Sequence, residues 1–193
     1  MMPTTRLART LAKGAVVAAL AVSALLPGLA YAAKPPPPPS VPDSQLVVTD
    51  GSAPFLLGHA VGTQNYTCQL KSDGTYAWTF VAPAATLYDA AGKVIATHYA
   101  GPTWQAVPDG STVVGLKQYG VTVDPTAIPW LRLSAKSTSL GPDGGDRLFA
   151  TTDVQRVNTT GGLAPTSGCD ASNVGAETDV PYTADYYFYE FHE

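Results

Sequence analysis

The sequence predicts an all-β protein, built as an antiparallel β-sandwich or flattened barrel of about eight to eleven strands with little helix. From Gln45 onward, apolar and polar residues alternate with a period of two, which is typical of strands with one buried face. Glycine turn dipeptides separate the alternating runs. Seventeen prolines are spread along the chain, and no long window has helical periodicity.

Three runs show the alternation most clearly, and each is predicted to be a strand: Gln64–Leu70, Thr75–Phe80 and Leu131–Lys136. In the first run, Tyr66 and Cys68 share a face with Leu70. Between the runs lie dipeptides that accept a positive φ and close tight turns: Asp50-Gly51, Asp73-Gly74, Ala91-Gly92, Asp109-Gly110 and Asp143-Gly144.

The last expected strand, Tyr182–Phe191, is aromatic on both faces. Tyr187 and Tyr189 lie on one face, while Tyr186 and Phe188 lie on the other. A strand that is apolar on both faces is usually covered on both, so we expect a central strand here. The alternative is an exposed aromatic platform for sugars or peptides, with Tyr187 as its candidate binding residue.

The first 32 residues have the pattern of an export signal. Arg6 and Arg9 precede an apolar run from Gly14 to Leu26, and Ala30-Tyr31-Ala32 offers a cleavage site. The thirteen-residue run is too short to cross about 30 Å of hydrocarbon, so we expect no membrane span and a secreted or periplasmic protein. A proline-rich linker is expected over residues 33–42, and a single all-β domain over residues 43–193.

Charge and cysteine content narrow the possible functions. Without the signal, eight basic residues stand against fifteen acidic ones, a net charge of −7 that disfavours nucleic acid as a partner. In an oxidising compartment, the two cysteines are expected to form a Cys68–Cys169 disulfide, with two buried thiols as the alternative. Two sequons, at Asn65 and Asn158, match the glycosylation pattern but carry meaning only in a host that uses it.

A series of short motifs, in a fixed order, resembles a secreted bacterial and fungal domain of unknown function, numbered thirty-four fifty-five. The motifs are Val61–Cys68, Tyr76–Phe80, Pro83–Leu87, His98–Trp104, Asp109–Ser111, Ile128–Leu131, Gln155–Thr159 and Pro181–Tyr189. The resemblance covers roughly residues 41–190 and implies a secreted all-β domain. It implies no activity.

Fungal members of that family are often labelled malate dehydrogenase, and the residues of this chain argue against such an activity. A dinucleotide site of that kind needs a glycine-rich turn between a strand and a helix. The chain has no G-x-G-x-x-G motif and no expected helix to receive a pyrophosphate. We therefore expect no cofactor.

The most suggestive local group for catalysis is His98 with Trp104 and Asp109, in which His98 would act as a general base oriented by Asp109. The competing interpretation is a turn at Asp109-Gly110-Ser111 beside a buried, hydrogen-bonded His98. Gly101-Pro102 is expected to interrupt the strand. The chain would turn there, leaving His98 and Trp104 on opposite sides of a corner, with Trp104 mostly buried.

Arg156 is the other candidate site residue. It could clamp a carboxylate ligand bidentately, although an internal salt bridge is the simpler expectation. The three histidines are isolated in the sequence, so no metal site is expected.

The sequence favours a secreted binding or structural module, and leaves its partner unknown apart from a possible small-molecule or glycan ligand. Trp104 and Tyr187 are its candidate binding residues. The alternative is a small secreted hydrolase or isomerase, with His98, Arg156 and a carboxylate in a cleft.

Overall fold

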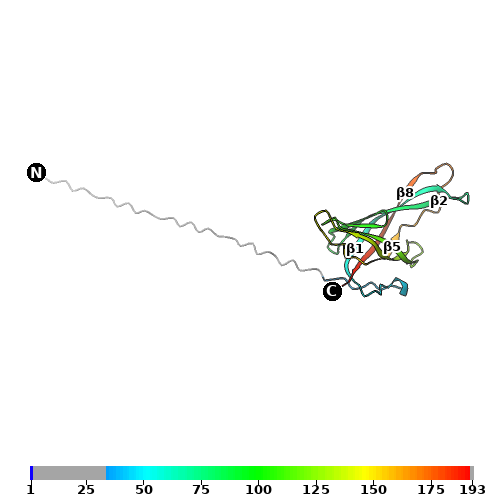
Figure 1. The fold of residues 1–193 in the computed structure, drawn as a ribbon. Helices are drawn as coiled ribbons and strands as arrows, with labels where there is room; N and C mark the ends of the chain where they lie inside the picture. Colours follow the sequence, from blue (N-terminus) through cyan, green and yellow to red (C-terminus); the bar gives the residue numbers. More distant parts are fainter. Residues whose placement is uncertain (2–33, 192–193) are drawn as a thin grey trace. The chain divides into compact units, whose positions relative to one another are not determined.

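The computed structural model describes Met1 and residues 34–191, so the expected signal segment lies outside the described residues. Of these, residues 34–191 belong to one compact unit. Its regular elements, in chain order, are η1 (Ser44–Leu46), β1 (Ala53–Leu70), β2 (Tyr76–Tyr88), β3 (Val94–Tyr99), β4 (Thr103–Ala106), β5 (Thr112–Val121), β6 (Trp130–Ser139), β7 (Asp153–Gly161) and β8 (Glu177–Glu190) (Figure 1).

The eight strands form a closed barrel in which every strand is antiparallel to the next and β8 returns to β1. The predicted all-β class is confirmed, and the architecture is a barrel. In the part of the chain described, helical structure is confined to the three residues of η1. The sheet closes on itself, although β3 and β4 are short: among the described residues, β2 pairs with β3 only from Ala85 to Tyr88, so the first half of β2 keeps a free edge.

β1 and β8 close the barrel. They pair from Ala53 opposite Glu190 to Thr67 opposite Glu177. The C-terminal strand is therefore bonded on both edges, by β1 and by β7, as its aromatic composition predicts. Its side chains at Tyr186 and Phe188 are buried in the core of the barrel.

The up-and-down topology gives the barrel two different ends. The turns that follow β2, β4 and β6 lie at the same end as Ala53 and Glu190. The buried core residues Leu87, Ala106 and Val113 lie next to these turns, so we call this the packed end. Leu148, from the β6–β7 connection, is fully buried at this end, and its backbone N–H donates to Ser111 Oγ at 3.0 Å. The turns after β1, β3, β5 and β7 lie at the other end, which we call the open end.

A short segment before β1 packs on the outside of the barrel. Leu46 is fully buried, and its carbonyl accepts a 2.5 Å hydrogen bond from Gln155 Nε2 on β7. The Tyr189 hydroxyl donates to Gln155 Oε1, and the Tyr119 hydroxyl donates to Asp43 Oδ2 at 2.9 Å. On β7, Gln155 points outward and Val154 points into the core, so this strand is buried on both faces.

The predicted disulfide is confirmed. Cys68 on β1 is bonded to Cys169 in the β7–β8 connection, with their Cα atoms 5.3 Å apart. The connection folds back over the β1–β2 hairpin, because the Cys68 N–H donates to the Ala176 carbonyl at 2.8 Å and Trp78 Nε1 donates to the Ser167 carbonyl at 2.9 Å. The bridge thus fixes the longest loop of the open end to the barrel wall.

Removing this bridge should lower stability. The double substitution Cys68→Ala, Cys169→Ala frees a loop that spans 101 residues, so we expect the free energy of unfolding to fall by about 2–5 kcal/mol. Equilibrium urea unfolding of the non-reduced proteins measures the difference. An unchanged denaturation midpoint would contradict a stabilising role for the disulfide.

Leu46 should contribute to stability as a core residue does, although it precedes the barrel. Leu46→Ala is expected to cost about 2–5 kcal/mol, because it leaves a cavity under the segment. Val47→Ala is the matched control, since Val47 is exposed and should change stability by less than about 0.5 kcal/mol. Thermal unfolding of both variants tests this, and equal melting temperatures would contradict it.

Candidate functional site

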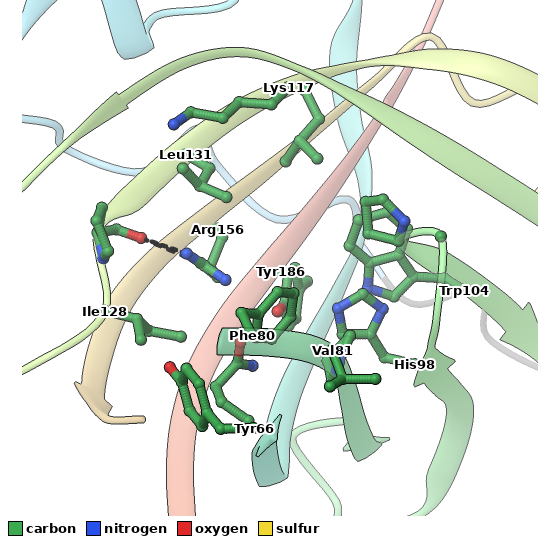
Figure 2. Close-up of a pocket in the computed structure, with 16 residues that line it drawn as sticks. Tyr66, Phe80, Val81, His98, Trp104, Lys117, Ile128, Leu131, Arg156 and Tyr186 are labelled. Carbon is green, nitrogen blue, oxygen red and sulfur yellow. Dashed lines mark hydrogen bonds between the residues drawn. The ribbon is translucent and has the colours of Figure 1, made fainter. Parts of the chain in front are cut away.

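The open end of the barrel contains a cavity of about 500 Å³ (Figure 2). Most of its wall is apolar or aromatic, and two of its residues are basic. The lining residues are Gln64, Tyr66, Phe80, Val81, Pro83, His98, Gly101, Pro102, Trp104, Lys117, Ile128, Pro129, Leu131, Leu133, Arg156 and Tyr186. We call this space the barrel cavity.

The floor of the barrel cavity is an aromatic cluster. The rings of His98 and Trp104 are stacked, with centroids 4.3 Å apart and planes 6° apart, and Tyr186 meets both edge-on. Trp104 is 1% exposed, which confirms its predicted burial.

The sequence prediction was right about the turn at Gly101-Pro102 and wrong about its geometry. The chain does turn there, between β3 and β4. The expectation that His98 and Trp104 lie on opposite sides of a corner is wrong, since they are direct partners across the β3–β4 hairpin. Directly opposed residues of antiparallel strands point to the same face, and this pairing produces the stack.

His98 is buried and hydrogen-bonded, as the structural interpretation predicts. Its Nδ1 lies 2.9 Å from the Thr103 carbonyl, an acceptor, so Nδ1 carries the proton and Nε2 the lone pair. Burial lowers the pKa of His98 to about 3, with a further lowering by the positive charge of Arg156, and the Thr103 hydrogen bond opposes this only in part. The imidazole is therefore neutral at physiological pH.

Asp109 does not join His98. It occupies the turn between β4 and β5, at the packed end, where Oδ1 accepts from the Ser111 N–H at 3.0 Å and Oδ2 accepts from the Arg147 N–H at 2.9 Å. Burial acts to raise the pKa of Asp109, but these hydrogen bonds together lower it. The candidate His98–Asp109 pair is not brought together, because β4 lies between them, and Asp109 forms the turn that the competing interpretation predicts.

Arg156 reaches the barrel cavity from β7 and is half-buried. Its Nε and Nη2 both donate to the Pro129 carbonyl, at 3.1 and 2.8 Å. The expected internal salt bridge is wrong: within residues 34–191, no carboxylate lies within 4.0 Å of this guanidinium. His98 and Arg156 are thus brought to one cavity without an acidic partner.

Two buried polar atoms on cavity-lining residues have no hydrogen-bond partner: Gln64 Nε2 and Trp104 Nε1. Buried N–H groups are nearly always paired, so each of these needs an acceptor from water or a ligand. Sequence reasoning missed Gln64, Tyr66 and Lys117 as cavity residues. The available signal was the position of Gln64, a polar residue on the same strand face as Tyr66 and Cys68.

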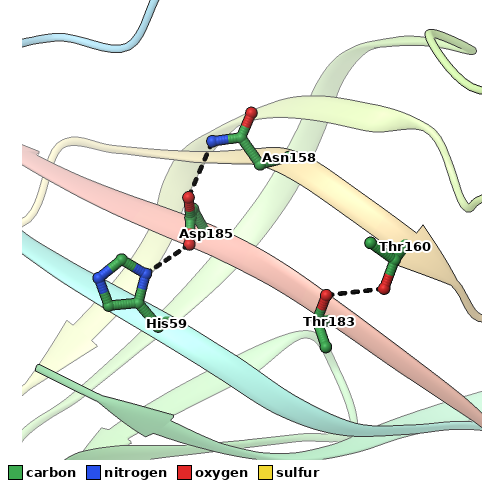
Figure 3. Close-up of polar contacts among 5 residues, drawn as sticks. All are labelled: His59, Asn158, Thr160, Thr183 and Asp185. Carbon is green, nitrogen blue, oxygen red and sulfur yellow. Dashed lines mark hydrogen bonds and ion pairs between the residues drawn. The ribbon is translucent and has the colours of Figure 1, made fainter. Parts of the chain in front are cut away.

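A second polar cluster lies outside the barrel (Figure 3). Asp185 on β8 holds His59 Nδ1 of β1 at 2.6 Å through Oδ1, and accepts from Asn158 Nδ2 of β7 at 2.8 Å through Oδ2. Asn158 has a φ of 51° at a β-bulge, a conformation that asparagine tolerates better than most residues. Asp185 therefore links three strands across the closing seam and steadies the bulge.

The remaining candidates from the sequence lie away from the cavity. Tyr187 is half-buried and is not among the cavity-lining residues. Among the residues that the structure describes, no three His, Cys, Asp or Glu side chains are grouped so as to hold a metal ion; His192 lies outside them. The described residues also include no helix that is both long and apolar enough to cross a membrane.

Comparison with known proteins places this chain in a family. A model of a protein family of unknown function, DUF3455, matches residues 50–190, and the chain belongs to that family. The resemblance noted from its motifs is thereby confirmed. Neither the curated proteins nor the solved structures include a significant match.

The pKa of His98 predicts how stability depends on pH. It is about 3 in the folded protein and 6.5 in the unfolded chain, so the unfolded state binds more protons between these values and folding is weakened as pH falls. Between about pH 7.5 and about pH 5, the titration of His98 should therefore lower the free energy of unfolding of the wild type by about 2 kcal/mol.

His98→Asn removes the titration while keeping a donor for the Thr103 carbonyl. We expect the variant to be less stable than wild type at neutral pH through lost packing, and the gap to shrink by about 2 kcal/mol at pH 5. Urea unfolding at the two pH values measures both quantities. A stability difference between wild type and variant that is the same at both pH values would show that the fold does not hold His98 neutral.

Proposed function

We propose that this domain is an exported binding protein that holds one small, largely apolar molecule in the barrel cavity. The observation that carries the proposal is the cavity itself: about 500 Å³ of open space inside a closed barrel. Ligand sites in proteins commonly have volumes of about 300–1,000 Å³, with apolar walls and a few convergent polar groups.

The unpaired polar atoms support a ligand in preference to a purely structural role. Gln64 Nε2 and Trp104 Nε1 belong to cavity-lining residues and are buried without acceptors. Each unpaired buried donor costs about 1–3 kcal/mol of stability. An acceptor atom of a bound molecule would recover part of this cost if the side chains turned toward it.

Two features favour binding over the alternative of a hydrolase or isomerase. A general base works best with a pKa near the working pH, and the pKa of His98 is about 3. The carboxylate required by the enzyme hypothesis is also missing, since no Asp or Glu is among the cavity-lining residues of the described chain. His98 and Arg156 therefore fit the wall of a binding site better than a catalytic pair.

The proposed location outside the cytoplasm rests on two independent features. The first is the export pattern of residues 1–32. The second is the Cys68–Cys169 disulfide, a bond that is rare in reducing compartments.

A neutral apolar dye tests for the binding site without assuming a charge on the ligand. N-phenyl-1-naphthylamine, whose fluorescence rises in apolar surroundings, should bind the purified domain of residues 34–193. Leu131→Trp places a larger side chain in the cavity wall and should weaken dye binding by about tenfold.

Leu116→Trp is the matched control, because Leu116 is exposed and is not among the cavity-lining residues. It should bind the dye as the wild type does. Failure of the wild type to bind, or equal weakening by both substitutions, would count against a ligand site in the barrel.

A further inference from the structure

We infer that the ligand of the barrel cavity is an aromatic carboxylic acid, bound as its anion, with the carboxylate on Arg156 and the ring against Trp104 and Tyr186. This inference rests on the proposed binding function and specifies its ligand class. It follows from the unused hydrogen-bonding edge of Arg156, from the charge of the cavity and from the chemistry of its wall.

Arg156 is held so that one edge of its guanidinium is free. The Pro129 carbonyl occupies Nε and one proton of Nη2. No hydrogen bond among the described residues uses Nη1, so two protons on Nη1 and one on Nη2 remain. These two nitrogens form the end-on fork that matches the two oxygens of a carboxylate.

The positive charge of Arg156 has no counter-charge nearby. The sixteen cavity-lining residues of the described chain include Arg156 and Lys117 and no acid, although acidic residues outnumber basic ones in the whole sequence, fifteen to eleven. Lys117 is exposed at the rim, where water solvates it, whereas Arg156 is half-buried. The charge also reaches His98, whose pKa it lowers in addition to the larger effect of burial.

A single half-buried cation among neutral groups suits a ligand with one negative charge. A phosphate would bring a second charge that only the solvated Lys117 could meet. A glycan would need several polar partners, and the wall offers mainly apolar and aromatic side chains. The single carboxylate of a monocarboxylic acid pairs with the free edge of the Arg156 guanidinium and leaves no unpaired charge in the cavity.

The wall favours an aromatic body for this acid. His98 and Trp104 form a flat stack, and Tyr186 packs edge-on against it. At the rim, Phe80 meets Tyr66 edge-on, with centroids 5.7 Å apart. Rings gain from offset-stacked and edge-to-face contacts with such surfaces beyond the area that they bury. Figure 2 shows Arg156 on the wall of the same cavity as Trp104 and Tyr186.

The test compares two probes of nearly equal shape that differ in charge: 2-naphthoate and 2-naphthamide. Isothermal titration calorimetry on the domain of residues 34–193 measures both dissociation constants at neutral pH. We expect 2-naphthoate to bind about 10- to 100-fold more tightly, since hydrogen bonds to a charged group are worth about 1.5–3 kcal/mol.

Three variants assign the preference to Arg156. Arg156→Met should remove it, so that both probes bind with similar, weak affinity. Arg156→Lys keeps the charge but loses the fork, and should keep only part of the preference. Arg147→Met, the matched control, removes an exposed arginine outside the cavity lining and should behave as the wild type. Circular dichroism checks that each variant is folded.

The outcomes separate this inference from the proposed function. Equal binding of both probes to the wild type would overturn the carboxylate inference and leave the cavity as a binding site. A preference that persists in folded Arg156→Met and Arg156→Lys would also overturn it. If neither probe binds at about 1 mM, while the neutral dye also fails, the binding function itself fails.

Discussion

The pairing of β1 with β8 is the constraint on which the rest of this structure depends. These strands begin and end the barrel, and their ladder runs from Ala53 and Glu190 to Thr67 and Glu177. Without it, the sheet would be open, with two long edges and no enclosed space. Because the ladder forms, Tyr186 and Gln64 face the same interior as Arg156, although more than ninety residues of sequence separate Gln64 from Arg156. The Cys68–Cys169 bond and the His59–Asp185–Asn158 cluster both reinforce this seam, one inside the open end and one on the outer face.

The interior is packed at one end and hollow at the other for a reason visible in its side chains. At the packed end, Leu148 enters from the β6–β7 connection and is fully buried against the core. At the open end, Pro102 and Pro129 of two connections line the cavity, while the β7–β8 loop is fixed to the β1–β2 hairpin by the disulfide and by Trp78, so this loop supports the rim. Arg156 then projects into space that no acidic side chain of the described residues occupies. The site is formed by the closed sheet, by the β7–β8 loop that the disulfide holds at the rim, and by the charge of Arg156, which has no acidic partner.

The sequence predicted the strands of this fold better than the register between them. Alternation with period two identified the strands around Tyr66 and Leu131, because the pleat forces neighbouring side chains to opposite faces whatever lies beside the strand. The disulfide followed from counting two cysteines. The stack of His98 on Trp104 was not predictable, since it depends on the register of β3 against β4. The open fork of Arg156 was missed for a similar reason: composition suggests an acid nearby for every arginine, and only the packed structure shows that Pro129 stands there instead.

The pairing of Ala53 with Glu190 places the start and the end of the barrel at the packed end, opposite the cavity. A carrier domain or a solid support joined after β8 would therefore attach at the base of the barrel. The proline-rich residues 35–39 would add a stiff spacer of about 3.1 Å per residue on the N-terminal side. A tethered copy of the domain would present its mouth to the surrounding solution, and molecules could enter and leave without passing the point of attachment.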